Sequence, residues 1–341
     1  MPSSPIRRPV LAALAAALLG ACAQAQEAAP LPALGIDPGR VAVVGLSSGA
    51  AFATQAHLAF PERFVGAGLV AGPPYGCAGG DLQQALGSCM KGEPAPDAAT
   101  LAAQVRERAQ AGRIGDLSGL EGDRVWILHG RRDPVVAAPV AQAAANLYRT
   151  LAADAPGLEV VVDDARELGH GLPTADTGVD CATTGTPFLN ACGFDAAGAA
   201  LEAIYGSAAN AAPAQAGGAL MPFDQAALQP EGADAYLGDT GYLYVPERCR
   251  GESCGAVVVL HGCEQNADSV GDAFVRGSGF NRWADAYGLV VLYPQTRASY
   301  TPLNPKACWD WWGYSGADYD TRQGVQLRWL TAALDRLSGA R

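Results

Sequence analysis

The stretch Val41-Ala-Val-Val-Gly-Leu-Ser-Ser-Gly49 joins a strand-forming run to the short motif Gly-x-Ser-x-Gly. The next residues, 50–60, contain neither glycine nor proline and predict a helix that ends before Pro61. A strand, a tight turn with a serine at its tip and a helix together make a nucleophile elbow. A serine hydroxyl is a weak nucleophile, so it must be exposed to a base and to backbone N–H donors. Ser47 is therefore the candidate nucleophile, and the flanking elements argue against a chance match.

The partners of Ser47 can be sought by position, because in an α/β-hydrolase arrangement the acid and the histidine follow the serine, each after a strand. Asp133 follows the predicted strand 124–128, and His170 follows the predicted strand 158–162 between two glycines. His170 would act as general base and then general acid, while Asp133 would hold its ring. Their alternatives are a loop-capping carboxylate and a surface histidine.

Other residues compete for these two roles. Asp163 and Asp164 are rivals for the acid, while His57 lies on the helix after the elbow and is expected to be structural. His129 and His261 each follow a strand in a His-Gly pair.

The oxyanion hole normally uses the N–H after the nucleophile, here that of Ser48, and an N–H from a His-Gly loop earlier in the chain. No such loop precedes Ser47, but His261-Gly-Cys263 follows the predicted strand 256–260 far downstream. The order is therefore rotated: we expect a circularly permuted α/β-hydrolase fold in which Leu337 lies close to Ile36. Chain termini often lie close together at a domain surface, which makes such permutation tolerable.

Elements alternate between strand and helix through the chain, which predicts a mostly parallel central sheet with helices on both faces. A glycine- and proline-rich segment, 72–96, is expected to form a loop over the site, and 206–235 is expected to be an internal linker. The remaining predicted strands are 65–71, 242–245 and 289–293, and the remaining predicted helices are 97–111, 139–151, 195–205, 274–287 and 320–337.

Composition narrows the class of protein. The chain has 341 residues, of which 49% are hydrophobic, enough for a single large domain with a full core. Its net charge of −11 argues against nucleic acid or an anionic membrane surface as a partner. We expect a monomer.

The N-terminus has the features of a signal peptide over residues 1–25, with the catalytic domain in 26–341. Arg7 and Arg8 precede an apolar run, 10–20, that is too short to span a bilayer, and Ala23-Gln-Ala25 fits a cleavage site. A lipid anchor at Cys22 is the open alternative. The sequence therefore predicts a secreted protein, extracellular or periplasmic.

Secretion changes how the nine cysteines are interpreted. Cys22 lies in the signal, and an even eight remain, which indicates four disulfides in an oxidising compartment. Close spacing favours three pairs and leaves a long-range fourth: Cys77–Cys89, Cys181–Cys192, Cys249–Cys254 and Cys263–Cys308. No Cys-x-x-Cys is present and the histidines sit in other motifs, so neither a metal nor a cofactor is expected.

Three motifs carry a specific resemblance. They are Gly45-Leu-Ser-Ser-Gly-Ala50, Leu260-His-Gly-Cys263 and Asn304-Pro-Lys-Ala-Cys-Trp-Asp-Trp311. With them the mature chain resembles the circularly permuted extracellular poly(3-hydroxybutyrate) depolymerases, single-domain secreted esterases of α/β-hydrolase fold. The resemblance implies the triad Ser47, Asp133 and His170, an oxyanion N–H from a disulfide-bonded Cys263, and a crevice wall from Trp309 or Trp311. We do not expect the separate polymer-adsorbing domain that many bacterial members carry, and we therefore expect inefficient attack on solid polymer.

The expected function is hydrolysis of hydroxyalkanoate polyesters or their oligomers. Trp309 and Trp311 alternate beside Cys308 and suit a wall for an aliphatic chain, although core packing is the alternative for at least one of them. A secreted esterase for acetyl or feruloyl groups of plant polysaccharide would share the fold and the triad. A non-catalytic polymer- or sugar-binding protein is the third hypothesis.

Overall fold

A nine-stranded sheet forms the centre of the molecule. The computed structural model describes residue 1 and residues 28–340, so nearly all of the expected signal peptide, including Cys22, lies outside the described residues. The strands of this sheet are β1 (Ala29–Pro30), β2 (Val41–Leu46), β3 (Gly66–Val70), β4 (Arg124–Leu128), β5 (Glu159–Asp163), β9 (Ala219–Asp224), β10 (Thr240–Val245), β11 (Gly255–Leu260) and β12 (Leu289–Tyr293). Their order is β1-β9-β10-β12-β11-β2-β3-β4-β5. Neighbours from β12 to β5 are parallel, while β10 runs antiparallel to both β9 and β12.

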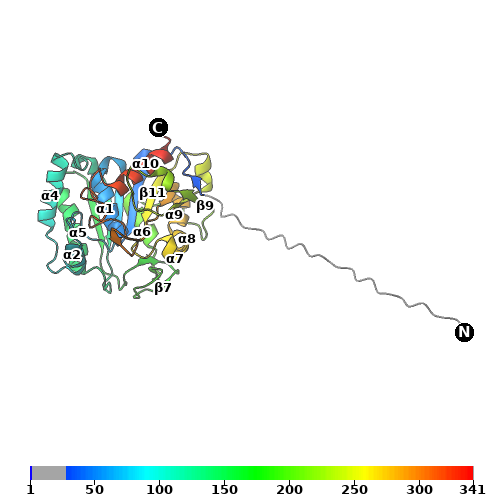
Figure 1. The fold of residues 1–341 in the computed structure, drawn as a ribbon, viewed down its shortest axis with the longest axis horizontal. Coiled ribbons are helices and arrows are strands. Elements are labelled where there is room, and N and C mark those ends of the chain that lie inside the picture. Colours follow the sequence, from blue (N-terminus) through cyan, green and yellow to red (C-terminus); the bar gives the residue numbers. More distant parts are fainter. Residues whose placement is uncertain (2–27, 341) are drawn as a thin grey trace.

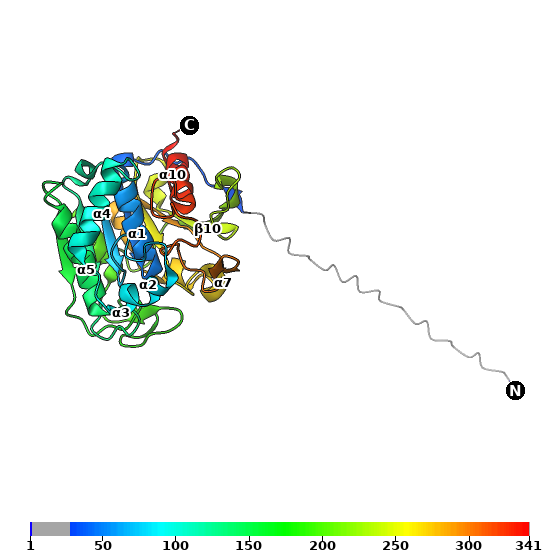
Figure 2. The same ribbon diagram turned by 60° about the vertical axis from the view of Figure 1, so that its left-hand side comes forward.

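Helices cover both faces of the sheet, as expected (Figure 1). They are α1 (Ser48–Ala59), α2 (Leu82–Leu86), α3 (Ser88–Lys91), α4 (Ala98–Gln110), α5 (Ala138–Leu151), α6 (Ala196–Tyr205), α7 (Ala267–Val270), α8 (Ala273–Gly277), α9 (Phe280–Tyr287) and α10 (Val325–Ser338). Side chains of α1, α4, α5 and α10 share one core with the sheet, and those of α6, α8 and α9 share the other. Figure 2 labels the four helices of the first group. Val43 and Val44 of β2 enter opposite cores, because successive strand residues point to opposite faces. Both faces of β2, β11 and β12 are thereby buried, which explains their unbroken apolar sequences.

Smaller elements lie on the loops. Strands β6 (Leu172–Thr174), β7 (Val179–Asp180) and β8 (Leu189–Ala191) form a three-stranded sheet, and β13 (Ser299–Tyr300) pairs with β14 (Leu303–Asn304). The four disulfides join the expected pairs, Cys77–Cys89, Cys181–Cys192, Cys249–Cys254 and Cys263–Cys308. Within residues 28–340 no helix is both long enough and apolar enough to cross a membrane.

Three predicted elements differ from the structure. The helix expected over 274–287 is two helices, because Gly279 takes a left-handed conformation with φ 89° between α8 and α9. The closing helix begins at Val325 instead of Asp320, whose buried carboxylate is paired with Arg108. The expected linker 206–235 contains β9, whose backbone pairs with the whole of β10.

The C-terminal helix ends beside the segment that leads into β2. The backbone N–H groups of Leu34 and Ile36 lie 2.9 and 3.4 Å from the Leu337 carbonyl oxygen, to which they donate hydrogen bonds. The expected neighbourhood of Leu337 and Ile36 is therefore confirmed. Strand β2 pairs with β11 in parallel, so the loops after these two strands meet at one edge of the sheet.

Candidate active site

Ser47 occupies a strained turn between β2 and α1. Its φ of 56° and ψ of −118° are rare for a residue with a side chain, and its N–H donates to the Val70 carbonyl at 2.8 Å. The flanking glycines allow the close packing that the turn needs. A Cβ atom on Gly45 would lie 2.2 Å from the Gly49 backbone, and one on Gly49 would lie 2.4 Å from the Leu260 carbonyl oxygen. These contacts give the geometry of a nucleophile elbow.

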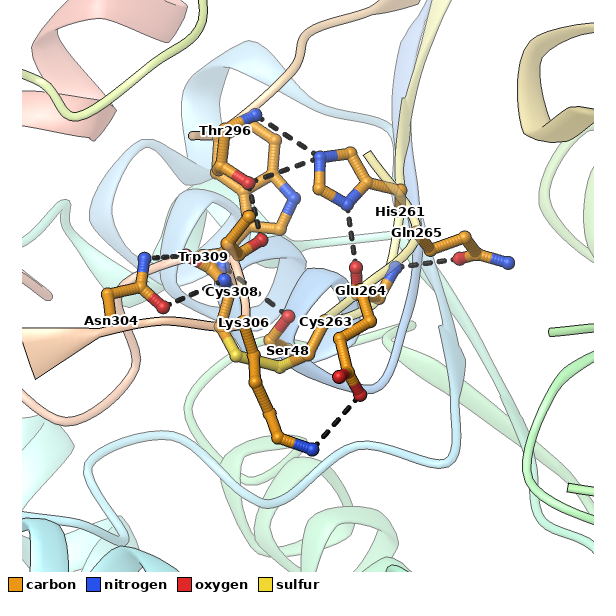
Figure 3. Close-up of a disulfide and its surroundings, with 12 residues drawn as sticks. Ser48, His261, Cys263, Glu264, Gln265, Thr296, Asn304, Lys306, Cys308 and Trp309 are labelled. Carbon is orange, nitrogen blue, oxygen red and sulfur yellow. Dashed lines mark hydrogen bonds and ion pairs between the residues drawn. A yellow bond between two sulfur atoms is a disulfide. The ribbon is translucent and has the colours of Figure 1, made fainter. Parts of the chain in front are cut away.

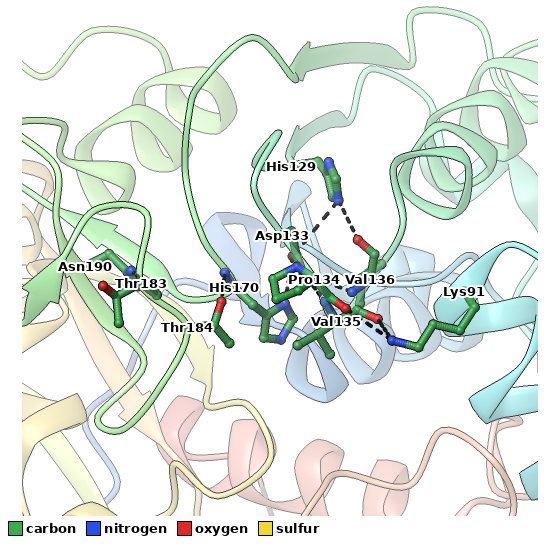
Figure 4. A network of polar contacts seen from close by, with 10 residues as sticks. All are labelled: Lys91, His129, Asp133, Pro134, Val135, Val136, His170, Thr183, Thr184 and Asn190. Carbon is green, nitrogen blue, oxygen red and sulfur yellow. Dashed lines mark hydrogen bonds and ion pairs between the residues drawn. The ribbon is translucent and has the colours of Figure 1, made fainter.

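Asp133 and His170 form a hydrogen-bonded pair on the loops after β4 and β5 (Figure 4). His170 Nδ1 lies 2.7 Å from Asp133 Oδ2, and the His170 backbone N–H donates to Thr184 Oγ1 at 2.8 Å. An ionised carboxylate can only accept, so Nδ1 carries the proton and Nε2 is left free to act as a base.

The Asp133 carboxylate is buried and yet well supplied with donors. Burial by itself would raise the pKa of Asp133. The hydrogen bond from His170 and the N–H groups of Val135 and Val136, at 2.8 and 2.9 Å from Oδ1, outweigh burial and lower the pKa below its ordinary value. Asp133 is therefore held as the anion that can orient the His170 ring.

The rival residues have other partners. His57 is buried and bonds Tyr148 Oη and Asp123 Oδ2, each at 2.9 Å, which is a structural role. His129 Nε2 lies 2.8 Å from the Val136 carbonyl oxygen and 4.0 Å from Asp133 Oδ2. Neither histidine lines the cavity described next.

A cavity of about 380 Å³ opens at this edge of the sheet. Ser47, Ser48, His170 and Cys263 all line it, and Asp133 lies behind His170. Among the described residues no hydrogen bond links Ser47 to His170, a loose pairing that is common before substrate binds. The remaining walls are mainly apolar and include Leu46, Leu82, Leu86, Met90, Val135, Phe188, Leu303, Trp311 and Trp312. The cavity therefore joins the candidate nucleophile Ser47 and the candidate base His170 to an apolar enclosure.

The backbone N–H groups of Ser48 and Cys263, two residues that line this cavity beside Ser47 and His170, have no recorded partner within residues 28–340. The amides on either side of Cys263 are engaged (Figure 3). The N–H of Gly262 donates to Gln265 Oε1 at 2.8 Å, and the N–H of Glu264 donates to the Lys306 carbonyl oxygen at 2.7 Å. A free amide between two bonded ones, beside the nucleophile, suits an oxyanion donor.

Of the two tryptophans proposed for the crevice wall, Trp311 lines the cavity and Trp309 belongs to the core. Trp309 is fully buried, stacks on Phe52 with ring centroids 4.7 Å apart, and does not line the cavity. Trp309 and Trp311 lie in the same loop, and only one of them faces the cavity. Trp311 does so, and it meets Trp312 edge-on at 5.7 Å.

Sequence analysis also missed part of the wall. Leu82, Leu86 and Met90 come from α2 and α3, within the segment expected to be a loop over the site. Their spacing of four residues matches one helix face and was the available signal. The Cys77–Cys89 disulfide joins the start of this segment to α3.

Comparisons with known proteins point to one family. The family model described as esterase PHB depolymerase matches residues 240–341. A poly(3-hydroxybutyrate) depolymerase of Delftia acidovorans is 36% identical over 337 residues, covering 96% of this chain and 66% of its own length. A polyhydroxybutyrate depolymerase of Talaromyces funiculosus is 34% identical over 327 residues, covering 91% of this chain and 93% of its own.

Solved structures agree. The crystal structure of PHB depolymerase from Penicillium funiculosum matches with a TM-score of 0.81 and 29% identity, over 91% of this chain and 99% of that one. A serine-to-alanine variant of a PHB depolymerase, complexed with an R3HB trimer, matches with the same values. This chain belongs to the family of PHB depolymerase esterases.

Proposed function

We propose that this chain is a serine esterase that hydrolyses poly(3-hydroxybutyrate)-type polyesters or their oligomers. The observation that carries the proposal is the cavity itself, where Ser47, His170 and two unpartnered backbone N–H groups meet apolar walls. The relatives named above bear that activity in their names, and one of them was solved with an R3HB trimer.

The reaction follows from the positions of these groups. His170 Nε2 takes the proton from Ser47 Oγ as that oxygen bonds the ester carbonyl carbon, and the carbonyl electron pair moves to its oxygen. The N–H groups of Ser48 and Cys263 bind this oxyanion. The intermediate then collapses, and the leaving alcohol takes the proton from His170. Water, deprotonated by His170, attacks the acyl carbon; the bond from that carbon to Ser47 Oγ then breaks, Oγ takes the proton back from His170, and the acid is released.

The walls favour an aliphatic ester over a sugar ester. A sugar-binding site needs several polar groups free to bond hydroxyls, whereas apolar side chains dominate this cavity. Its two charged residues, Lys306 and Glu264, bond each other at 3.0 Å. Purified protein should therefore release 3-hydroxybutyrate units from oligomers and leave acetylated xylan intact, and the opposite preference would support the carbohydrate-esterase alternative.

The chain order and destination complete the proposal. The fold is a circularly permuted α/β-hydrolase. The end of α10 lies beside the segment that enters β2, and the loop with the oxyanion donor follows β11, after the elbow in the chain instead of before it. Export through the signal in residues 1–25 is supported by four disulfides, which persist in oxidising compartments.

The triad assignment has a direct test. Ser47→Ala and His170→Ala should each lower turnover on a soluble 3-hydroxybutyrate oligomer by roughly 10³-fold or more, because the groups act as one unit. Ser118→Ala is the control and should match the wild type, because Ser118 is exposed in the 3-10 helix Leu117–Leu120 and does not line the cavity. Full activity in Ser47→Ala would reject the assignment.

A further inference from the structure

His261 has no part in the mechanism described so far. It follows β11 directly, is fully buried, and does not line the cavity. Its ring lies between Phe274 and Trp309, with centroid distances of 6.3 and 5.6 Å. A buried histidine two residues before the Cys263 amide needs an explanation, because imidazole nitrogens are costly to bury without partners.

Both ring nitrogens of His261 have partners that define its protonation. Nδ1 lies 2.7 Å from the Gly262 carbonyl oxygen, which can only accept, so Nδ1 carries a proton. Burial lowers the pKa of His261 to about 4, so the ring is neutral and Nε2 is bare. Nε2 then accepts from the Thr296 backbone N–H at 3.2 Å. The ring is fixed at both ends.

The carbonyl that His261 bonds belongs to the same peptide group as the proposed oxyanion donor, the Cys263 N–H. The Gly262 C=O and the Cys263 N–H are the two polar groups of one planar peptide unit, and in a trans peptide they point in opposite directions. Fixing the oxygen therefore fixes the direction of the N–H. Within residues 28–340, His261 Nδ1 is the one recorded donor to that oxygen. The bonds of Gln265 and Lys306 hold the neighbouring amides, not this one.

We propose that His261 is a positioning residue for the oxyanion hole: its Nδ1–H aims the Cys263 N–H at the reacting carbonyl oxygen (Figure 3). The inference rests on the proposed function. A hydrogen bond at the carbonyl also polarises the peptide and strengthens its N–H as a donor. Because the donor matters most once negative charge develops, its loss slows turnover and leaves substrate binding nearly unchanged.

Two substitutions at this position separate the two ring nitrogens. His261→Asn can keep an amide donor near the place of Nδ1, while His261→Gln places its amide nearer to Nε2. We expect His261→Gln to lower kcat on a soluble 3-hydroxybutyrate oligomer by about 10- to 100-fold, less than the 10²–10³ for complete loss of a donor. KM should stay within about two-fold, since uniform binding is unaffected. His261→Asn should regain most of the lost kcat.

The binding of a transition-state analogue distinguishes a positioning role from a purely structural one, because its inhibition constant depends on the oxyanion donors. A trifluoromethyl ketone analogue of the substrate adds to Ser47 and places an oxyanion where the reaction does. Its inhibition constant should rise in His261→Gln by the factor by which kcat/KM falls. His57→Gln is the matched control: it removes another buried, doubly bonded histidine, and it should lower the melting temperature without changing kcat or the inhibition constant.

A measurement on the wild type covers the case in which His261→Gln fails to fold. The proton NMR signal of His261 Nδ1–H should move downfield when the ketone adduct forms, because the oxyanion polarises the Gly262–Cys263 peptide. An unmoved signal, or a folded His261→Gln with wild-type kcat and inhibition, overturns the inference. Loss of the proposed function itself looks different, since hydrolysis would then survive Ser47→Ala.

Discussion

Four histidines in the chain have four different surroundings, and these decide what each ring can do. His170 faces the cavity with a carboxylate behind it, while His57 is enclosed by Tyr148 and Asp123. His129 bonds a backbone carbonyl, and His261 bridges a carbonyl and an amide. Only the first combines a free nitrogen with access to Ser47, so a single residue type serves both chemistry and architecture.

The buried position of His261 predicts a stability change in acid. Its folded pKa of about 4 lies below the ordinary 6.5, so in this interval the unfolded chain binds a proton that the native protein excludes. Stability should therefore fall as the pH drops from 6.5 to 4, by at most about 1.4 kcal/mol per pH unit from this residue. The free energy of unfolding, measured by chemical denaturation at several pH values in this range, should depend less steeply on pH in His261→Gln than in the wild type. Equal slopes would contradict the assignment.

Single residues were predictable where a motif fixes backbone geometry. Ser47, Asp133 and His170 were placed together because each follows a parallel strand, and such strands end at one edge of a sheet. Trp309 and Trp311 could not be told apart, since both are large and apolar in the same loop. Which one is buried depends on a partner, Phe52, that lies far away in the sequence.

At the scale of elements, the contact of α1 with β11 organises the site. Gly49, in the first turn of α1, packs directly on the backbone of Leu260 and His261 at the end of β11. The helix that starts at the nucleophile is thus set against the strand that leads to the oxyanion donor. The separation of α1 and β11 therefore sets the distance between Ser47 and the Cys263 N–H, the proposed nucleophile and oxyanion donor.

Gly49→Ala tests this contact. A Cβ atom there would lie 2.4 Å from the Leu260 oxygen and 2.5 Å from the His261 oxygen, so backbone must shift. We expect a loss of about 3 kcal/mol in the free energy of unfolding and a fall in turnover of roughly 10- to 100-fold. Gly251→Ala is the control, because nothing lies within 4 Å of its Cβ and its φ is −136°. Similar turnover in both variants would show that the spacing is not critical.

Element boundaries were less predictable than element types. The parallel strands were found because long apolar runs have few alternatives in an α/β chain. Strand β9 was missed, since its alanine- and glycine-rich surroundings resemble a linker and its pairing with β10 is a tertiary contact. The break between α8 and α9 depends on one glycine, Gly279, that a helix could also have tolerated.

For the molecule as a whole, the two ends of the described chain lie together. Leu34 and Ile36 bond Leu337, whereas residues 206–218 join α6 to β9. The proposed catalytic groups come from both segments: Ser47, Asp133 and His170 precede this connection, and Cys263 follows it.

The permutation should be reversible. Joining residue 340 to residue 28 through a flexible linker, and opening the chain within 206–218, should give a folded enzyme with turnover near that of the wild type. The measurement is turnover and melting temperature of the purified variant. As a control, the same joined chain opened within β11 should fail to fold, because all six residues of that strand are buried. An inactive, unfolded product from the first design would contradict the proposed topology.

The division of the site between two segments also sets when the chain can first react. A ribosome adds residues from the N-terminus, so Ser47, Asp133 and His170 are in place long before Cys263 is made. Until then the nucleophile has at most one amide to stabilise an oxyanion. The strand that carries the second amide is itself one of the last central strands to be synthesised, and α10 follows it. A growing chain therefore lacks the second proposed oxyanion donor until β11 and Cys263 have been made, so full turnover by the proposed mechanism requires most of the chain.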